Sequence, residues 1–211
     1  ERGETPGPWF VSLFPTNRCN LKCSICWQRR VDVDHSSEIS DERLLHFVDE
    51  CAELGAKEWV IVGGGEPMIR DELVIQMCER IRAHGMDGRI QTNGVRFREE
   101  HFERLIKAQW KEVVFSLDGP TAEINDEIRS AGSFVHATAN LRKFNELRRK
   151  YSSTRPEVHL TAVVTSTNYD KFDQMAELAN ELGCDGLRGG HLTPESELSL
   201  KFQLSGEQIG R

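Results

Sequence analysis

Three clustered cysteines are the residues of this sequence best suited to chemistry. Cys19, Cys23 and Cys26 are separated by three and then two intervening positions. Thiolates bind soft metals, and iron–sulfur clusters are held by cysteine thiolates. A four-iron cluster bound by only three protein thiolates would leave one iron open to another ligand. The spacing therefore favours a reactive iron–sulfur cluster.

A structural zinc site is the alternative use of the same cysteines. Such sites close with four ligands, usually in two pairs. His35 follows Cys26 by nine positions and could supply a fourth ligand. The C-x₃-C-x₂-C spacing is not a common finger spacing, so it favours the cluster. If the cysteines bound zinc, or a cluster used only for folding or docking, the chain would be a non-catalytic structural or interaction module.

The glycine-rich stretch Gly63-Gly64-Gly65-Glu66-Pro67 is the second informative feature. Glycine lacks Cβ, so these residues allow the backbone to approach a ligand closely. Glu66 offers a carboxylate acceptor, and Pro67 stiffens the turn. Alone, the stretch could be an ordinary turn between a strand and a helix. Its occurrence after the cysteine motif favours a ligand site.

In this order, the two motifs resemble those of the radical S-adenosylmethionine (SAM) enzymes, over about residues 8–190. A third match, Ser116-Leu117-Asp118-Gly119-Pro120 followed by 125–129, is similar to the subgroup that includes the molybdenum-cofactor cyclase and the peptide-maturing (SPASM-type) enzymes. In that subgroup a histidine stands where this chain has Asn125, so a role that needs an imidazole does not carry over.

This resemblance implies two cofactors, a [4Fe–4S] cluster and SAM. Cys19, Cys23 and Cys26 would bind three irons, and the amino and carboxylate groups of SAM would chelate the fourth. Reductive cleavage of SAM would then give a 5′-deoxyadenosyl radical, which abstracts hydrogen from a peptide or a small metabolite. A flavodoxin- or ferredoxin-like protein would supply the electron. No residue acting on the substrate is identified.

The resemblance also implies which residues surround SAM. Ile25 stands at a usually aromatic position beside the adenine, and Arg129 can bind a carboxylate with its planar fork. Arg129 could instead be a surface arginine. Asn93 could serve only to shape a turn, and Asn168 could be the N-cap of a helix. The expected SAM-binding set is Ile25, Gly64, Gly65, Glu66, Pro67, Asn93, Ser116, Asp118, Arg129 and Asn168.

Strands and helices alternate along the chain around these motifs. Apolar stretches predict strands at 9–14, 58–62, 88–92, 112–117, 158–164 and 185–188, and amphipathic stretches predict helices at 41–54, 71–84, 98–108, 121–150 (broken near Gly132) and 168–182. Alternation without tight hairpins predicts parallel strands with helical crossovers. Six units fall short of a full (β/α)₈ barrel, so we expect a partial (β/α)₆ TIM-like barrel. The motifs fall at the carboxyl ends of strands, where α/β folds carry their sites.

Composition sets the remaining expectations. The 211 residues include 27 basic and 34 acidic side chains, a net charge of −7 that argues against a nucleic-acid partner. No apolar run is long enough to cross a membrane. Six cysteines, three of them in one motif, do not resemble a secreted disulfide framework, so we expect a cytoplasmic location.

The expected domain organisation is a lead-in at 1–8, a barrel core at 9–190 and a C-terminal segment at 191–211. Ser205 is a candidate helix cap in that last segment, which would begin a truncated or disordered extension. Outside the motifs, the sequence predicts ordinary structural roles for Cys51, Cys78, Cys184, His159 and His191.

Overall fold

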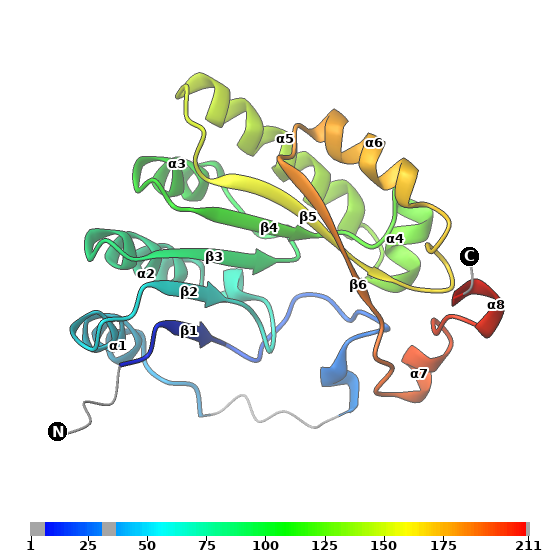
Figure 1. Cartoon of the computed structure of the whole chain (residues 1–211), viewed down its shortest axis with the longest axis horizontal. Coiled ribbons are helices and arrows are strands. Elements are labelled where there is room, and N and C mark those ends of the chain that lie inside the picture. The colour runs from blue at the N-terminus through cyan, green and yellow to red at the C-terminus, as the bar shows by residue number, and fades with distance from the viewer. Residues whose placement is uncertain (1–6, 31–36, 210–211) are drawn as a thin grey trace, which may run out of the picture.

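The computed structural model describes residues 7–30 and 37–209, so His35 and most of the lead-in lie outside the described residues. Six strands form one sheet in the order β1-β2-β3-β4-β5-β6, with every neighbouring pair parallel (Figure 1). Among the described strands, β1 and β6 do not pair with each other. The prediction of a partial, open (β/α)₆ barrel is therefore confirmed. The strands are β1 (Phe10–Leu13), β2 (Glu58–Ile61), β3 (Asp87–Thr92), β4 (Glu112–Ser116), β5 (Glu157–Val164) and β6 (Gly186–His191).

The long helices connect successive strands and cover the convex face of the sheet (Figure 1). None of the described helices is long and apolar enough to cross a membrane. The long helices are α1 (Asp41–Glu53), α2 (Asp71–Ala83), α3 (Glu99–Lys107), α5 (Ser133–Lys150) and α6 (Phe172–Leu182). The short helices are η1 (Trp27–Arg30), η2 (Pro67–Arg70), α4 (Ala122–Ile128), α7 (Glu197–Leu200) and α8 (Gly206–Ile209).

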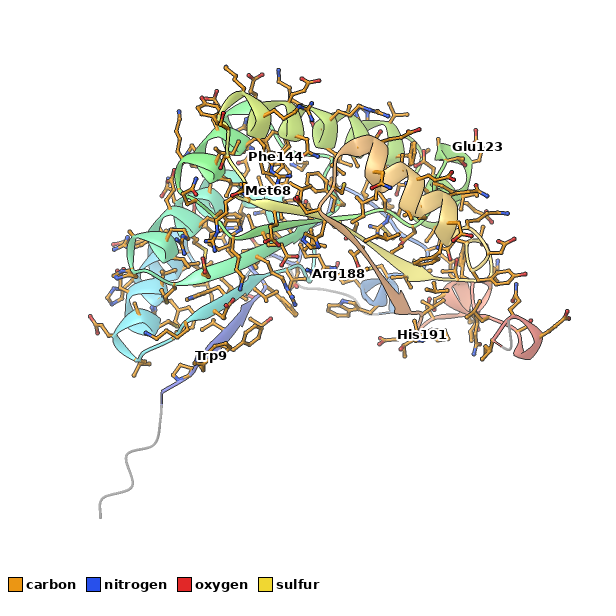
Figure 2. All side chains as sticks on the ribbon, turned by 45° about the horizontal axis from the view of Figure 1, so that its top comes forward. Trp9, Met68, Glu123, Phe144, Arg188 and His191 are labelled. Atoms are coloured by element: carbon orange, nitrogen blue, oxygen red, sulfur yellow. The ribbon has the colours of Figure 1, made fainter. Side chains whose placement is uncertain are left out.

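The core lies between these helices and the convex face of the sheet. Trp59, Ile90 and Phe115 are fully buried there, as is Phe144 from α5. Each such side chain contributes roughly 1.5–3 kcal/mol when it leaves water. Alternate strand residues face the concave side, which carries polar side chains such as Arg188 (Figure 2). The sheet thus separates an apolar core from a polar interior.

Helix ends follow their sequence signals. The Ser40 side chain accepts a hydrogen bond from the backbone N–H of Arg43 and caps α1. Gly183 ends α6 with φ of +72°, a left-handed conformation that favours glycine. Gly132, with φ of +79°, separates α4 from α5 and confirms the predicted break.

Two predicted boundaries were wrong. The helix after β5 begins at Phe172 with Lys171 as its N-cap residue, because Asn168 instead closes a turn by accepting a hydrogen bond from the N–H of Thr165. Asn168 is therefore not a helix cap. Strand β6 extends to His191, since its pairing with β5 continues through two glycines that carry little strand signal.

The segment after β6 packs against the loop that follows β5. The Ser166 N–H donates to the Phe202 carbonyl at 2.9 Å, and the Phe202 side chain is buried. Ser205 accepts from the Gln208 N–H, as expected of a cap for α8. These contacts place the described part of this segment beside the carboxyl ends of the strands.

Candidate functional site

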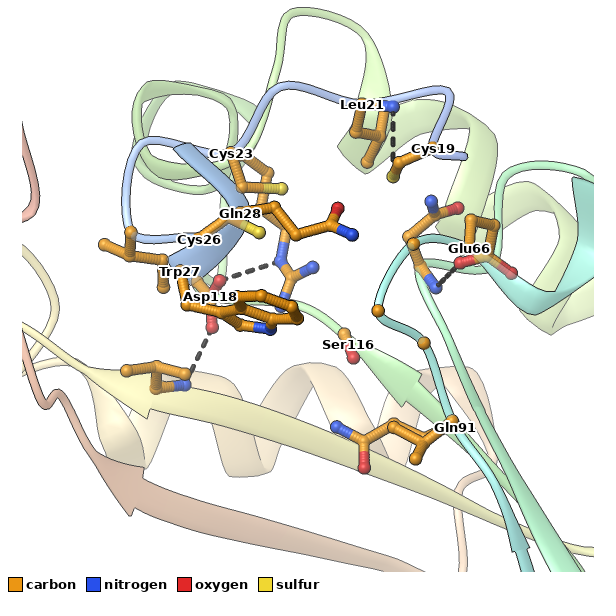
Figure 3. Close-up of a pocket in the computed structure, with 18 of the residues that line it drawn as sticks. Cys19, Leu21, Cys23, Cys26, Trp27, Gln28, Glu66, Gln91, Ser116 and Asp118 are labelled. Carbon is orange, nitrogen blue, oxygen red and sulfur yellow. Dashed lines mark hydrogen bonds and ion pairs between the residues drawn. The ribbon is translucent and has the colours of Figure 1, made fainter. Parts of the chain in front are cut away.

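A cavity of about 700 Å³ opens at the carboxyl ends of the strands (Figure 3). Its size is typical of a pocket for a small molecule or cofactor. Most of the residues predicted for the site line it: Cys19, Cys23, Ile25, Cys26, Gly64, Gly65, Glu66, Asn93, Ser116, Asp118 and Arg129. Pro67 and Asn168 do not. Segments that are far apart in sequence thus converge on one hollow.

The glycine turn after β2 packs directly against the start of the cysteine loop. The Gly65 N–H donates to the Thr16 carbonyl at 3.0 Å, and the Glu66 N–H donates to the Arg18 carbonyl at 2.9 Å. A Cβ on Gly65 would lie closer than 3.0 Å to the Arg18 carbonyl oxygen. Glycine is therefore required here by the neighbouring loop, whatever ligand the pocket holds.

Glu66 is buried and ties the glycine turn to the end of β3. Its carboxylate accepts hydrogen bonds from the Met68 N–H at 3.1 Å, the Thr92 hydroxyl at 2.6 Å and the Asn93 N–H at 2.7 Å. It also caps η2, in which Pro67 takes the first position. Burial raises the pKa of Glu66, although these hydrogen bonds oppose that shift. Because Oε2 accepts only one of them, it retains acceptor capacity for a further donor.

Asn93 joins the end of β3 to the cysteine loop. Its Oδ1 accepts from the Val95 N–H at 3.0 Å, the turn role that the sequence suggested. Its Nδ2 donates to the Asn20 Oδ1 at 2.9 Å. One side chain therefore shapes a turn, anchors the loop next to Cys19 and lines the pocket.

The opposite side of the cysteine loop is anchored at the end of α4. The Lys22 N–H donates to the Ser130 hydroxyl at 2.9 Å, and the Ser24 N–H donates to the Ile128 carbonyl at 2.7 Å. Cys23 therefore lies opposite Arg129. Burial raises the pKa of the Cys23 thiol to about 11, with Arg129 opposing the shift.

Asp118 holds Arg129 in place. The Asp118 Oδ2 lies 2.7 Å from Nε of Arg129, and its Oδ1 accepts from the Val163 N–H at 2.7 Å. The Arg129 side chain is only 12% exposed, so the surface-arginine alternative is wrong. Its two terminal nitrogens have no ion-pair or hydrogen-bond partner among the described residues. They are therefore available to a ligand carboxylate.

Two buried asparagines support the backbone of Asp118. The Asn125 Oδ1 accepts from the Asp118 N–H at 2.9 Å, and the Asn168 Nδ2 donates to the Asp118 carbonyl at 2.7 Å. Asn168 also donates to the Val163 carbonyl and is 1% exposed. Because both of its amide protons are engaged and it does not line the pocket, the geometry gives no support to its expected contact with SAM.

The three motif cysteines form a donor set that suits an iron–sulfur cluster, while His35, the candidate fourth zinc ligand, lies outside the described residues. In Figure 3 the labelled Cys19, Cys23 and Cys26 face the hollow from different positions on the loop. Within 7–30 and 37–209, no three His, Cys, Asp or Glu side chains are grouped to hold a metal ion. A cubane binds each of three thiolates to a different iron, so its ligands stand farther apart than those of one zinc ion.

Sequence reasoning missed several residues that line the pocket. His191 was assigned a structural role, yet it lies at the carboxyl end of β6 and lines the cavity, a place that the predicted topology could have indicated. Gln91 lies on β3, and Gln28 donates to the Asn17 carbonyl beside the glycine turn. Neither glutamine carried a recognisable motif.

Comparison with known proteins identifies the family. Residues 13–179 match the model of the Radical SAM superfamily. The mycofactocin maturase MftC of Mycolicibacterium smegmatis is 31% identical over 183 residues, which cover 87% of this chain and 44% of MftC. The AdoMet-dependent heme synthase of Methanosarcina barkeri is 29% identical over 180 residues, covering 85% and 49%.

Solved structures agree on the fold. Streptococcus suis SuiB bound to S-adenosylmethionine superimposes with a TM-score of 0.79 at 17% identity, covering 95% of this chain and 44% of SuiB. SuiB bound to its precursor peptide SuiA gives 0.74 at 18%, covering 89% and 40%. The chain spans about half the length, or less, of these proteins. It belongs to the radical SAM superfamily, whose members are enzymes that use a [4Fe–4S] cluster and SAM.

Proposed function

We propose that this chain is the core of an enzyme that cleaves SAM reductively to start radical chemistry on a substrate. The observation that carries the proposal is that the three motif cysteines and the Gly-Gly-Glu turn line one pocket. Cys19, Cys23 and Cys26 would hold the irons of a [4Fe–4S] cluster. When bound, such a cluster would supply one electron to the SAM sulfonium; the C5′–S bond would break to release methionine and a 5′-deoxyadenosyl radical, which would abstract a hydrogen atom from the substrate.

The protein's own part is to orient SAM. Arg129 presents its two terminal nitrogens for the SAM carboxylate while Asp118 holds Nε, and Ser116 lines the same wall. Glu66 offers its remaining lone pair on Oε2 to the SAM ammonium. On the opposite side Ile25 lines the pocket and would pack against the adenine.

A peptide is the substrate class that we propose, with a flavodoxin- or ferredoxin-like protein as electron donor. A relative at 31% identity is named a maturase, and a structural neighbour is described with its precursor peptide bound. The open edge between β1 and β6 supports this choice, because it leaves the concave face reachable by a bulky substrate. A haem precursor is the second candidate, supported by the relative named as a heme synthase.

The test is anaerobic reconstitution with iron and sulfide, followed by dithionite, SAM and chromatography for 5′-deoxyadenosine. Alanine at position 19, 23 or 26 should abolish the product, because each thiolate holds a different iron. Cys184→Ala, at a half-buried cysteine outside the pocket, is the matched control and should retain activity. Product from any motif variant would refute the assignment, and bound zinc without iron would favour the structural module.

A further inference from the structure

Two hydrogen bonds fix Cys23 against Arg129. The two neighbours of Cys23 bond to the two neighbours of Arg129. Lys22 bonds to Ser130, and Ser24 bonds to Ile128. The loop therefore cannot move Cys23 away from Arg129 without breaking one of them. Both side chains line the same pocket, so the positive charge of Arg129 lies beside the position at which Cys23 would bind an iron.

Asp118 completes this arrangement with a charge of opposite sign. It is fully buried, lies 2.7 Å from Nε of Arg129 and is held by hydrogen bonds to its backbone and side chain. Its negative charge therefore lies beside the positive charge of Arg129, in the same pocket as Cys23. A buried ion pair is costly to desolvate and contributes little net stability.

We propose that the Asp118–Arg129 pair sets the reduction potential of the cluster through Cys23, with Arg129 raising the potential and Asp118 lowering it. The inference rests on the proposed function, because it requires Cys23 to bind an iron. Reduction adds one electron, supplied by the protein electron donor or by dithionite, to the cluster and its thiolates. A nearby cation stabilises that added negative charge and a nearby anion destabilises it. The balance between the two charges therefore decides how readily the electron is accepted.

The test is a redox titration of the reconstituted protein without SAM, followed by electron paramagnetic resonance of the reduced cluster. Arg129→Gln should lower the potential, and Asp118→Asn should raise it. Each change should alter the ratio of reduced to oxidised cluster at fixed potential by about tenfold, which is ~59 mV for one electron. The double variant removes both charges and should return the potential close to the wild-type value. Arg129→Lys keeps the charge and should do the same.

Arg142→Gln is the matched control, because it makes the same substitution at an exposed position on α5 and should leave the potential unchanged. Equal potentials in the wild type and both single variants would overturn the proposal. So would shifts in the same direction, which would indicate disturbance of the loop and not the two charges. A wild-type protein that binds no cluster would instead refute the proposed function, so the two failures are distinguishable.

Discussion

Replacing Glu66 with glutamine tests whether the motif glutamate holds the site together. The glutamine amide can place its oxygen at either carboxylate position. It loses fewer hydrogen bonds with the oxygen at the Oε1 position, which keeps the hydrogen bonds from Met68 and Thr92. Its NH₂ group then faces the Asn93 N–H across the 2.7 Å now spanned by a hydrogen bond. One charge-assisted bond is lost and a buried donor is left unpaired, a cost of about 3 kcal/mol.

For a chain of this size that cost corresponds to a fall in melting temperature of roughly 6–12 °C. Thermal unfolding of the metal-free protein, followed by circular dichroism, would measure it. Glu72→Gln is the control, because Glu72 is 57% exposed and its ion pair with Arg104 lies on the surface. Its variant should lose at most about 1 kcal/mol. If the two variants have the same melting temperature, the hydrogen bonds of Glu66 do not stabilise the fold as expected.

Two further substitutions test other parts of the site. Gly65→Ala should lower the amount of iron bound per chain without changing the circular dichroism spectrum, because the added Cβ would push against Arg18 in the cysteine loop. Gly190→Ala is the control and should bind iron normally, because the space around Gly190 is open. Asp126→Asn should lower the unfolding free energy by about 1–2 kcal/mol, because Asp126 accepts from the N–H groups that begin α5. Burial acts to raise the pKa of Asp126, but its hydrogen bonds outweigh burial and hold that pKa below its ordinary value. The stabilisation by Asp126 is therefore full above about pH 4 and is lost as the pH falls through the folded-state pKa. Denaturant titrations at pH 7 and pH 3 should therefore show a smaller difference at the lower pH, and an equal difference at both would contradict the reasoning.

The alternation of strands and helices was predictable because each element carries its own periodicity. Trp59 and Ile61 alternate with residues of the concave face, and Ser40 and Gly183 mark helix ends by local chemistry. The end of β6 was not predictable, because Gly189 and Gly190 pair through backbone atoms alone. Its extent is determined by the neighbouring strand and not by its own side chains.

The pocket residues were predictable where a motif named them, but their contacts were not. Glu66 was expected to bind a ligand, yet its carboxylate already accepts three hydrogen bonds from the protein. Asn168 was expected to contact SAM or to cap a helix, and it supports the Asp118 carbonyl instead. Asn168 and Asp118 are 50 positions apart, and Glu66 lies 26 and 27 positions from Thr92 and Asn93, so no local pattern could reveal these contacts.

The motif residues therefore bind the loops to one another as well as lining a ligand site. Glu66 bonds to Asn93, Asn93 bonds to Asn20, and the loop that follows Asn20 is anchored through Ser130 beside Arg129. These hydrogen bonds link each loop to the next and so hold the loops in position. It follows that polar residues at this end of the sheet, even those that never reach a ligand, contribute to the geometry in which the three cysteines are presented.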